Sequence, residues 1–460
     1  MRYLSTRGEA PLLPFEAAMM TGLAADGGLY VPEAVPALAP DEIAALAGLP
    51  YEEAAFRVMR PFVGDAFGDE EFRALIVDAY AGFSHRARVP LVQLAENHFL
   101  LELFHGPTLA FKDVAMQLIG RLFAAVLART GRRIAIVGAT SGDTGSAAIE
   151  AFRGLPGVDV FILFPEGRVS EVQRRQMTTP AEANVHALAL AGTFDDCQAR
   201  LKEMFADRAF ADAVGLAGVN SINWARVLAQ VVYFVTAAVS LGAPRRAVSF
   251  TVPTGNFGDV YAGSIARRLG VPIERLVVAT NQNDILDRTL RTGESRREGV
   301  RPSISPSMDI EVSSNFERAL FDAYGRDAAA VRADMASLRA DGGFRVGQGA
   351  LSALREVYAS GRASEEETAA AIARTLRETG ELVCPHTAVG LHVAEGHLGA
   401  TPMVTLATAH PAKFPDAVEA ATGLRPPLPA RLSHLYDRPE RLTRVPDDAE
   451  ALKRLVRERL

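Results

Sequence analysis

Lysine is scarce in this chain, so each lysine in an unusual context is a candidate for chemistry. Of the 49 basic residues among 460, only four are lysine, at positions 112, 202, 413 and 453, and the other 45 are arginine. Arginine keeps its proton, whereas a desolvated lysine can lose its proton and attack an aldehyde to form an imine. A lysine surrounded by apolar residues and glycine therefore indicates amine chemistry.

Lys112 has such surroundings, in the segment Leu103–Asp113. A predicted strand ends here, a Gly-Pro turn follows, and the lysine begins an apolar helix. The positive end of a helix disfavours an ammonium group, so this placement lowers the pKa of Lys112 and favours a nucleophilic amine. The alternative is an ordinary helix lysine whose stem packs along the helix. Asp113 fits a first-turn residue better than a catalyst, and His105 would either contact a phosphate or form a structural hydrogen bond.

Two glycine-rich loops are predicted to bind anions. Gly138–Gly145 and Pro253–Asp259 each join a predicted strand to a predicted helix, where free amides at a helix N-terminus attract negative charge. The glycines of the first loop do not fit G-x-G-x-x-G, and no lysine follows as in a Walker loop. In the second loop the amides and the Asn256 side chain would cradle a phosphate monoester. For either loop alone, a tight strand-to-helix turn is the alternative.

An alternation of strands and helices is predicted to position these segments. The expected strands are 91–95, 100–104, 133–139, 158–164, 185–190, 247–252, 276–280 and 403–408, and the expected helices are 111–129, 144–152, 171–177, 195–207, 221–240 and 258–269. Apolar strands that alternate with helices are typical of a parallel sheet covered on both faces. Ligands bind beyond the carboxyl ends of such strands, so the segments after Ala139, after Val252 and at Thr408 are expected to meet at one site.

The predicted domain organisation has two parts. Residues 1–85 are predicted to form a mainly helical N-terminal domain punctuated by prolines, with amphipathic stretches at 41–46 and 52–59. Residues 86–460 are predicted to form the α/β region, with large and small subdomains. Within it, residues 303–380 are expected to be a helical, charged insertion at the periphery.

Composition narrows the classes of function. A net charge of −6 lacks the excess of positive charge that is typical of proteins that bind nucleic acid or an anionic membrane. No apolar run has the length of a bilayer span, and Met1–Gly8 lacks the apolar core of a signal peptide, which predicts a cytoplasmic protein. Cys197 and Cys384 lie far apart without metal-ligand spacing, so two reduced thiols and no metal site are predicted.

Several of these segments together resemble the threonine synthase family. The resemblance rests on Phe104–Asp113, Thr140–Gly145, Gly255–Asp259 and Thr408–Phe414, and also on Tyr3–Gly8, Leu23–Pro32 and Asn220–Arg226. It runs over nearly the whole chain and is closest to the longer microbial and fungal branch. The resemblance implies an α/β fold of the fold-type II pyridoxal-phosphate enzymes, with two open, largely parallel sheet domains and a mainly helical N-terminal domain.

The resemblance also implies roles for residues at matching positions. Lys112 would hold pyridoxal 5'-phosphate as a Schiff base, and Thr408 would face its pyridine nitrogen. The loop expected around the cofactor phosphate comprises Gly255, Asn256, Phe257, Gly258 and Asp259. The loop expected to receive the substrate carboxylate comprises Thr140, Ser141, Gly142, Asp143 and Thr144. Arg226 and Lys413 are candidates for binding the phosphate of the substrate.

The reaction implied by the resemblance is the conversion of O-phospho-L-homoserine and water to L-threonine and phosphate. It is a γ-elimination followed by addition of water at the β-carbon, in which Lys112 would abstract the α-proton and shuttle protons at the β and γ positions. A hydroxyl at Thr408, unlike a carboxylate, would not hold the ring nitrogen protonated. The expected partner is a small phosphorylated amino acid, without nucleic acid or membrane, and the expected state is a monomer or homodimer.

Three other functions stay open at this point. The nearest is a pyridoxal-phosphate-dependent phospholyase that releases 2-oxobutyrate from O-phosphothreonine or O-phosphohomoserine, because it would share these motifs. A non-catalytic anion- or nucleotide-binding α/β protein predicts no visible chromophore and no spectral loss when Lys112 is replaced. A nicotinamide dehydrogenase is disfavoured because its glycine fingerprint is missing.

Overall fold

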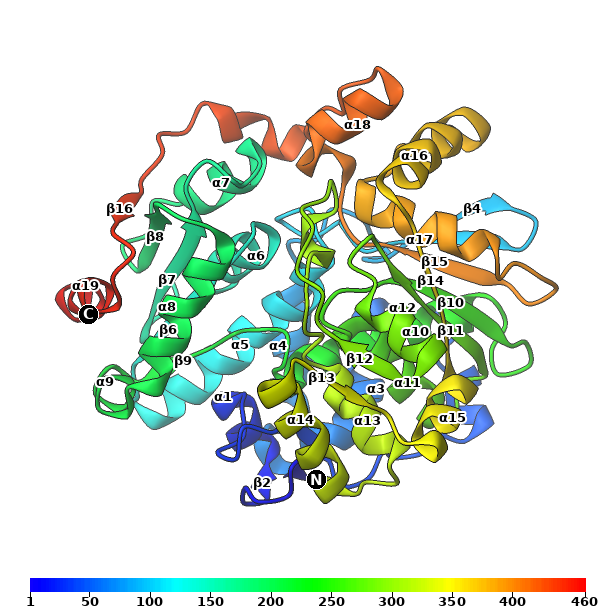
Figure 1. Cartoon of the computed structure of the whole chain (residues 1–460), viewed down its shortest axis with the longest axis horizontal. Helices are drawn as coiled ribbons and strands as arrows, with labels where there is room; N and C mark the ends of the chain where they lie inside the picture. Colours follow the sequence, from blue (N-terminus) through cyan, green and yellow to red (C-terminus); the bar gives the residue numbers. More distant parts are fainter.

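The computed structural model describes residues 1–460 and contains two α/β units, each built around a parallel sheet (Figure 1). The N-terminal segment packs against both units through one continuous buried core. Every strand and helix predicted between residues 91 and 280, and the strand at 403–408, occurs with its ends shifted by at most three residues. The α/β fold class is therefore confirmed.

The N-terminal segment combines helices with a small antiparallel sheet that the sequence analysis did not predict. Its elements are β1 (Arg2–Ser5), β2 (Leu13–Pro14), α1 (Phe15–Thr21), β3 (Tyr30–Pro32), α2 (Pro40–Ala44), α3 (Tyr51–Val63) and α4 (Asp69–Tyr80). The strand order is β2-β1-β3. The Tyr3 hydroxyl donates to the Phe62 carbonyl at 2.8 Å and accepts from Trp224 Nε1 at 3.1 Å, which fixes β1 onto the body of the protein.

A six-stranded sheet forms the core of the larger unit. Its order is β14 (Tyr358–Arg362), β11 (Ile273–Thr280), β10 (Val248–Pro253), β15 (Met403–Ala407), β5 (His98–Glu102) and β4 (Leu91–Ala95). Only β4 is antiparallel to its neighbour. All six residues of β10 are buried, as expected for a parallel strand covered on both faces. The helices of this part are α10 (Trp224–Ser240), α11 (Gly258–Arg268), α12 (Ile285–Thr292), α13 (Phe316–Ala323), α14 (Ala328–Asp341), α15 (Gln348–Val357), α16 (Glu365–Thr379) and α17 (Pro385–Glu395).

A five-stranded parallel sheet forms the smaller unit. Its order is β16 (Thr443–Val445), β8 (Val185–Leu190), β7 (Val158–Pro165), β6 (Ile134–Ala139) and β9 (Leu216–Ala217). Its helices are α6 (Asp143–Phe152), α7 (Glu171–Thr178), α8 (Phe194–Ala206) and α9 (Arg208–Val214), and the long helix α5 (Lys112–Thr130) contacts α6 of this unit and α10 of the larger one. All eight residues of β7 are buried.

The C-terminal segment crosses from one unit to the other. After β15 and α18 (Pro415–Thr422), the chain runs back to the smaller unit, as the orange-to-red segment in Figure 1 shows. There β16 pairs with β8 at the edge of the five-stranded sheet, and α19 (Ala449–Arg459) follows it. Arg174 of α7 makes two hydrogen bonds to Glu440 on the way, at 2.9 and 3.0 Å. The two units are therefore tied together by the chain itself.

The prediction that residues 303–380 are peripheral is wrong. The segment is helical, as expected, but it also supplies β14, which pairs with β11 at the edge of the six-stranded sheet. Ser307 accepts a hydrogen bond from Lys112, so this segment reaches the predicted site. The short antiparallel pair of β12 (Glu294–Arg296) and β13 (Gly343–Arg345) closes a loop between α12 and α14. None of the helices has the length and apolar character needed to cross a membrane.

Candidate active site

A cavity of about 360 Å³ lies where strands of both sheets end. β6 ends at Ala139, β10 at Pro253 and β15 at Ala407, and each leads into a segment that lines the cavity. The carboxyl ends of parallel strands are where open α/β sheets bind ligands. Of the residues predicted for the site, those that line the cavity are Lys112, Thr140, Ser141, Thr144, Arg226, Gly255, Asn256, Phe257, Gly258, Asp259 and Thr408.

Lys112, the first residue of α5, is held in a fixed relation to Thr408. The Phe111 amide donates to the Thr408 carbonyl at 2.8 Å, and the His410 amide donates to the Leu109 carbonyl at 3.0 Å. These bonds join the segment before α5 to the segment after β15. The amine of Lys112 and the hydroxyl of Thr408 therefore line one cavity although nearly 300 residues separate them in the sequence.

The environment of the Lys112 amine makes its neutral form more accessible than that of an ordinary lysine. The side chain is buried, with Nζ 3.3 Å from Ser307 Oγ and 3.6 Å from Asp143 Oδ2. Burial lowers the pKa of Lys112 to about 8; the negative charge of Asp143 offsets part of this effect, and the positive charge of Arg226 adds to it. A neutral amine is the form that acts as a nucleophile or removes a proton.

Asp143 is the anion beside this amine, and a second lysine holds it in place. The fully buried Lys413 places Nζ 2.9 Å from Asp143 Oδ1 and donates to the Thr108 carbonyl at 2.8 Å. Gln173 Nε2 also donates to Asp143 Oδ1, at 2.9 Å. Burial alone would raise the pKa of Asp143, but the cations Lys413 and Lys112 outweigh it and hold that pKa well below its usual range. Asp143 is therefore a fixed negative charge.

The loop after β10 presents a row of unused backbone amides. No amide from 255 to 260 donates to a protein acceptor, because these residues precede the first bonded turn of α11. The Gly255 carbonyl accepts from Ser313 Oγ at 2.6 Å, and the Asn256 carbonyl accepts from the Asn315 amide at 3.0 Å. The carbonyls are thus turned to the protein, and the free amides form a cradle suited to an anion.

Local geometry restricts which residues this cradle can contain. Phe257 adopts φ of 61°, in the left-handed region, as the chain turns into α11. A Cβ on Gly255 would lie 2.6 Å from the Ser307 carbonyl oxygen, too close for any other residue without movement of the backbone. Burial raises the pKa of Asp259 to about 7 despite a hydrogen bond from the Tyr233 hydroxyl, so near neutral pH about half of this carboxyl is protonated and it repels a neighbouring anion less than an ordinary aspartate would.

The loop after β6 presents a second set of unused backbone amides. Thr140 Oγ1 accepts from the Gly142 and Gly145 amides, both at 2.9 Å, and so shapes the loop from inside. The amides left without a protein acceptor are those of Ser141, Asp143 and Thr144. They lie at the N-terminus of α6, where the helix dipole attracts negative charge.

The chain is similar to known families and proteins over nearly its whole length. Residues 2–80 match the profile of the threonine synthase N terminus, residues 84–338 that of the pyridoxal-phosphate-dependent enzymes, and residues 387–456 that of the threonine synthase C-terminal region. The threonine synthase of Pseudomonas aeruginosa is 52% identical over 99% of this chain and 98% of its own. The chain belongs to the threonine synthase family.

Solved structures of threonine synthases have the same fold as this family member. The structure of the Brucella melitensis enzyme with bound pyridoxal phosphate superposes with a TM-score of 0.98 at 56% identity, covering 100% of this chain and 99% of that one. The yeast threonine synthase superposes with a TM-score of 0.94 at 38% identity, covering 100% and 98%. This family member is thus a pyridoxal-phosphate-dependent enzyme of fold type II.

Ser307 and His386 are among the cavity residues of this threonine synthase family member that were not identified from the sequence. Ser307, in the 3-10 turn Pro306–Met308, accepts from Lys112, and its amide donates to His386 Nε2 at 3.1 Å. Burial lowers the pKa of His386 to about 4, so this ring is neutral. The signals in the sequence were weak: a run of serines and prolines at 302–307 and a Cys-Pro-His start to α17.

The structure changes the predicted role of Lys413. Its Nζ is fully buried, is not part of the cavity lining and is occupied by Asp143 and the Thr108 carbonyl, so it does not reach a ligand in the cavity. Gly142 and Asp143 likewise do not line the cavity. Arg226 does line it: burial lowers the pKa of Arg226 to about 10, and its Nε has no hydrogen-bond partner.

The lowered pKa of Lys112 predicts the pH dependence of its reactivity in the cofactor-free protein. Its rate of acetylation by acetic anhydride should rise about tenfold per pH unit below pH 8 and level off above it, because only the neutral amine reacts. The reference is N-acetyl-lysine amide, whose rate keeps rising to about pH 10. Mass spectrometry of the Lys112 peptide measures the rate; a midpoint shared with the reference compound contradicts the prediction.

Proposed function

We propose that this protein converts O-phospho-L-homoserine and water to L-threonine and phosphate, with pyridoxal 5'-phosphate held in the cavity. The observation that carries the proposal is one buried amine of lowered pKa that shares a cavity with two separate sets of unused amides. One set suits the phosphate of the cofactor and the other the carboxylate of an amino-acid substrate.

The residues present fit pyridoxal phosphate. Its aldehyde needs an amine that can be neutral, and Lys112 offers one. Its phosphate monoester needs several donors, and the free amides from 255 to 260 offer them. Thr408 adds a hydroxyl to the lining that would face the pyridine nitrogen. When bound, the cofactor supplies an electron sink for carbanion chemistry.

Lys112 is the residue that would hold the cofactor and move protons. Displaced by the substrate amine and neutral, its Nζ would remove the proton from the α-carbon. It would then transfer protons at the β and γ carbons. Asp143 Oδ2, 3.6 Å away, would stabilise the protonated form of Nζ between these transfers. Because Lys413 fixes Asp143, this acid–base pair keeps its geometry through the cycle.

The other residues would bind and orient the substrate. The amides of Ser141 and Thr144, which line the cavity, would bind the α-carboxylate and so align the α-C–H bond for removal of its proton. Arg226 would bind the phosphate of the substrate, since this residue lines the cavity and its buried Nε has no hydrogen-bond partner. A hydroxyl at Thr408 would leave the pyridine nitrogen unprotonated and moderate the electron sink.

The setting proposed for this activity is the cytoplasm, with the protein acting on a small molecule as a monomer or homodimer. Both cysteines, Cys197 and Cys384, are buried free thiols.

The activity is tested by incubating the purified holoenzyme with O-phospho-L-homoserine and measuring phosphate, threonine and 2-oxobutyrate. Equal amounts of phosphate and threonine are expected, with O-phosphothreonine as the comparison substrate. Phosphate accompanied by 2-oxobutyrate in place of threonine would instead identify a phospholyase, with the same cofactor and the same cavity.

A further inference from the structure

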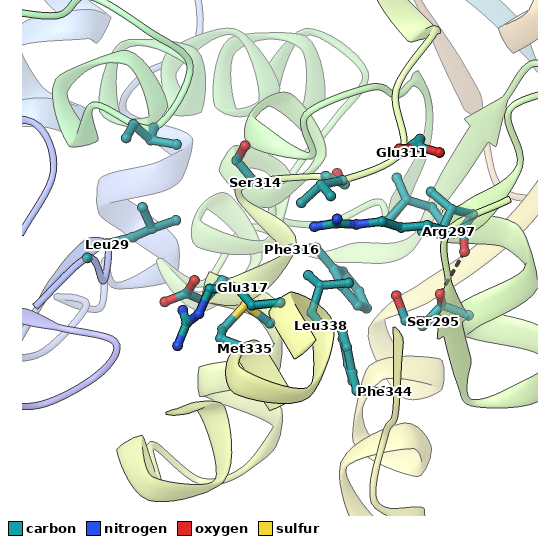
Figure 2. Close-up of a pocket in the computed structure, with 18 of the residues that line it drawn as sticks. Leu29, Ser295, Arg297, Glu311, Ser314, Phe316, Glu317, Met335, Leu338 and Phe344 are labelled. Carbon is teal, nitrogen blue, oxygen red and sulfur yellow. Dashed lines mark hydrogen bonds between the residues drawn. The ribbon is translucent and has the colours of Figure 1, made fainter. Parts of the chain in front are cut away.

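A second cavity, of about 300 Å³, lies apart from the catalytic residues, where the N-terminal segment meets α12, α13 and α14 (Figure 2). Its lining includes neither Lys112 nor any residue of either amide loop. Its volume is at the small end of the range for ligand pockets, about 300–1,000 Å³. The space therefore suits a single small molecule.

The inner wall of this second cavity is apolar. Leu29, Phe316, Met335, Leu338 and Phe344 line it, and each of them is buried. Figure 2 shows their side chains gathered around the same space from the N-terminal segment, α13, α14 and β13. An occupant needs an apolar group to fill this part of the cavity.

The rim of the second cavity carries charges that have no partner in the protein. Arg297 and Arg339 have no carboxylate within 4.0 Å, and Glu311 has no cation within that distance, whereas Arg7 is fully occupied by Glu317 at 2.9 Å. Figure 2 shows the Arg297 side chain extending across the cavity toward Ser314.

The Ser295 hydroxyl is a further polar group in the lining of the second cavity, beside the unpaired charges. Ser295 is buried in the lining, and its hydroxyl has no hydrogen-bond partner. Unpaired positive and negative groups around an apolar wall match a molecule with a carboxylate, an ammonium group and an apolar side chain.

The wall that separates the two cavities is thin. Ile222 and Ser314 line both of them. On either side of Ser314, Ser313 Oγ donates to the Gly255 carbonyl at 2.6 Å, and the Asn315 amide donates to the Asn256 carbonyl at 3.0 Å. A ligand that shifts Ser314 would therefore move the carbonyls that orient the amide cradle.

We propose that the second cavity binds a small α-amino acid with an apolar side chain, and that its occupancy is coupled to the catalytic cavity through residues 313–315. The carboxylate pairs with Arg297 and Arg339, the ammonium group pairs with Glu311, and the side chain fills the space beside Phe316.

Binding is tested by titrating the holoenzyme with L-leucine and L-phenylalanine in a calorimeter, with L-serine and leucine methyl ester as comparison ligands. Leucine or phenylalanine is expected to bind with Kd below about 10 mM, and the other two at least about tenfold more weakly. Arg297→Ala should weaken binding at least about tenfold, as should Leu338→Trp, which fills the cavity. Arg345→Ala, an exposed arginine on β13 outside the lining, should leave Kd unchanged.

Two results would overturn the binding proposal: no heat with either apolar amino acid, or equal Kd for the wild type and Arg297→Ala. The second result, with a change in the visible absorption of the cofactor, would place the amino acid in the catalytic cavity instead. Arg297 is exposed, so its variant should fold even if Leu338→Trp does not.

Coupling is tested with the cofactor-free protein. Saturating leucine or phenylalanine should change the Kd of pyridoxal phosphate by about fivefold, and pyridoxal phosphate should change the Kd of the amino acid by the same factor, because coupling free energies are reciprocal. Binding without such a change would overturn the coupling.

Discussion

Replacing Lys112 with arginine is expected to lower kcat at least about 1,000-fold while the protein stays folded. Arginine keeps a positive charge in the same place but cannot lose its proton at any working pH, so it can neither hold the cofactor aldehyde nor move protons at the substrate carbons. Release of phosphate and threonine measures the rate. The visible absorption of bound pyridoxal phosphate should disappear at the same time.

Lys453→Arg is the matched control for this prediction. Lys453 lies on α19 and pairs with Asp207 and Glu450, far from the cavity lining, so the same substitution there should leave kcat unchanged. An active Lys112→Arg enzyme, or one that keeps the cofactor absorption, would remove Lys112 from its proposed role. Circular dichroism would confirm that both variants are folded.

Replacing Lys413 with methionine is expected to destabilise the cofactor-free protein by about 3 kcal/mol, because it leaves a buried carboxylate without its closest cation. Asp143 would keep only Gln173 and the more distant Lys112 as partners. Its pKa would rise from the low value that Lys413 now maintains. The measurement is the shift of the urea midpoint of unfolding, with the slope checked for constancy.

A double-mutant cycle separates this ion pair from a general packing defect. Asp143→Asn removes the charge that Lys413 neutralises, so adding it to Lys413→Met should restore much of the lost stability. Additive losses in the double variant would show that the two side chains do not act as a pair. Lys453→Met, whose carboxylate partners both reach solvent, should give a much smaller shift.

The sequence by itself determined the elements around the site, because their signals are local. Apolar strands alternate with helices of 3.6-residue period, and glycines occur where strands turn into helices. These patterns placed β6, β10 and β15, located Lys112 at the start of α5 and predicted both loops with unused amides. The scarcity of lysine among the basic residues distinguished position 112 as a candidate amine.

Only the tertiary structure decided which distant side chains meet. Lys413 was predicted as a ligand for substrate phosphate, but packing of the segment after β15 buries it against Asp143. Residues 303–380 were predicted to be peripheral, yet Ser307 reaches Lys112 and Asn315 orients the Asn256 carbonyl. Charge and helical periodicity describe the surface of a segment and carry no information about which other segment it folds against. The second cavity depends on such contacts between distant segments, so no local pattern could have indicated it.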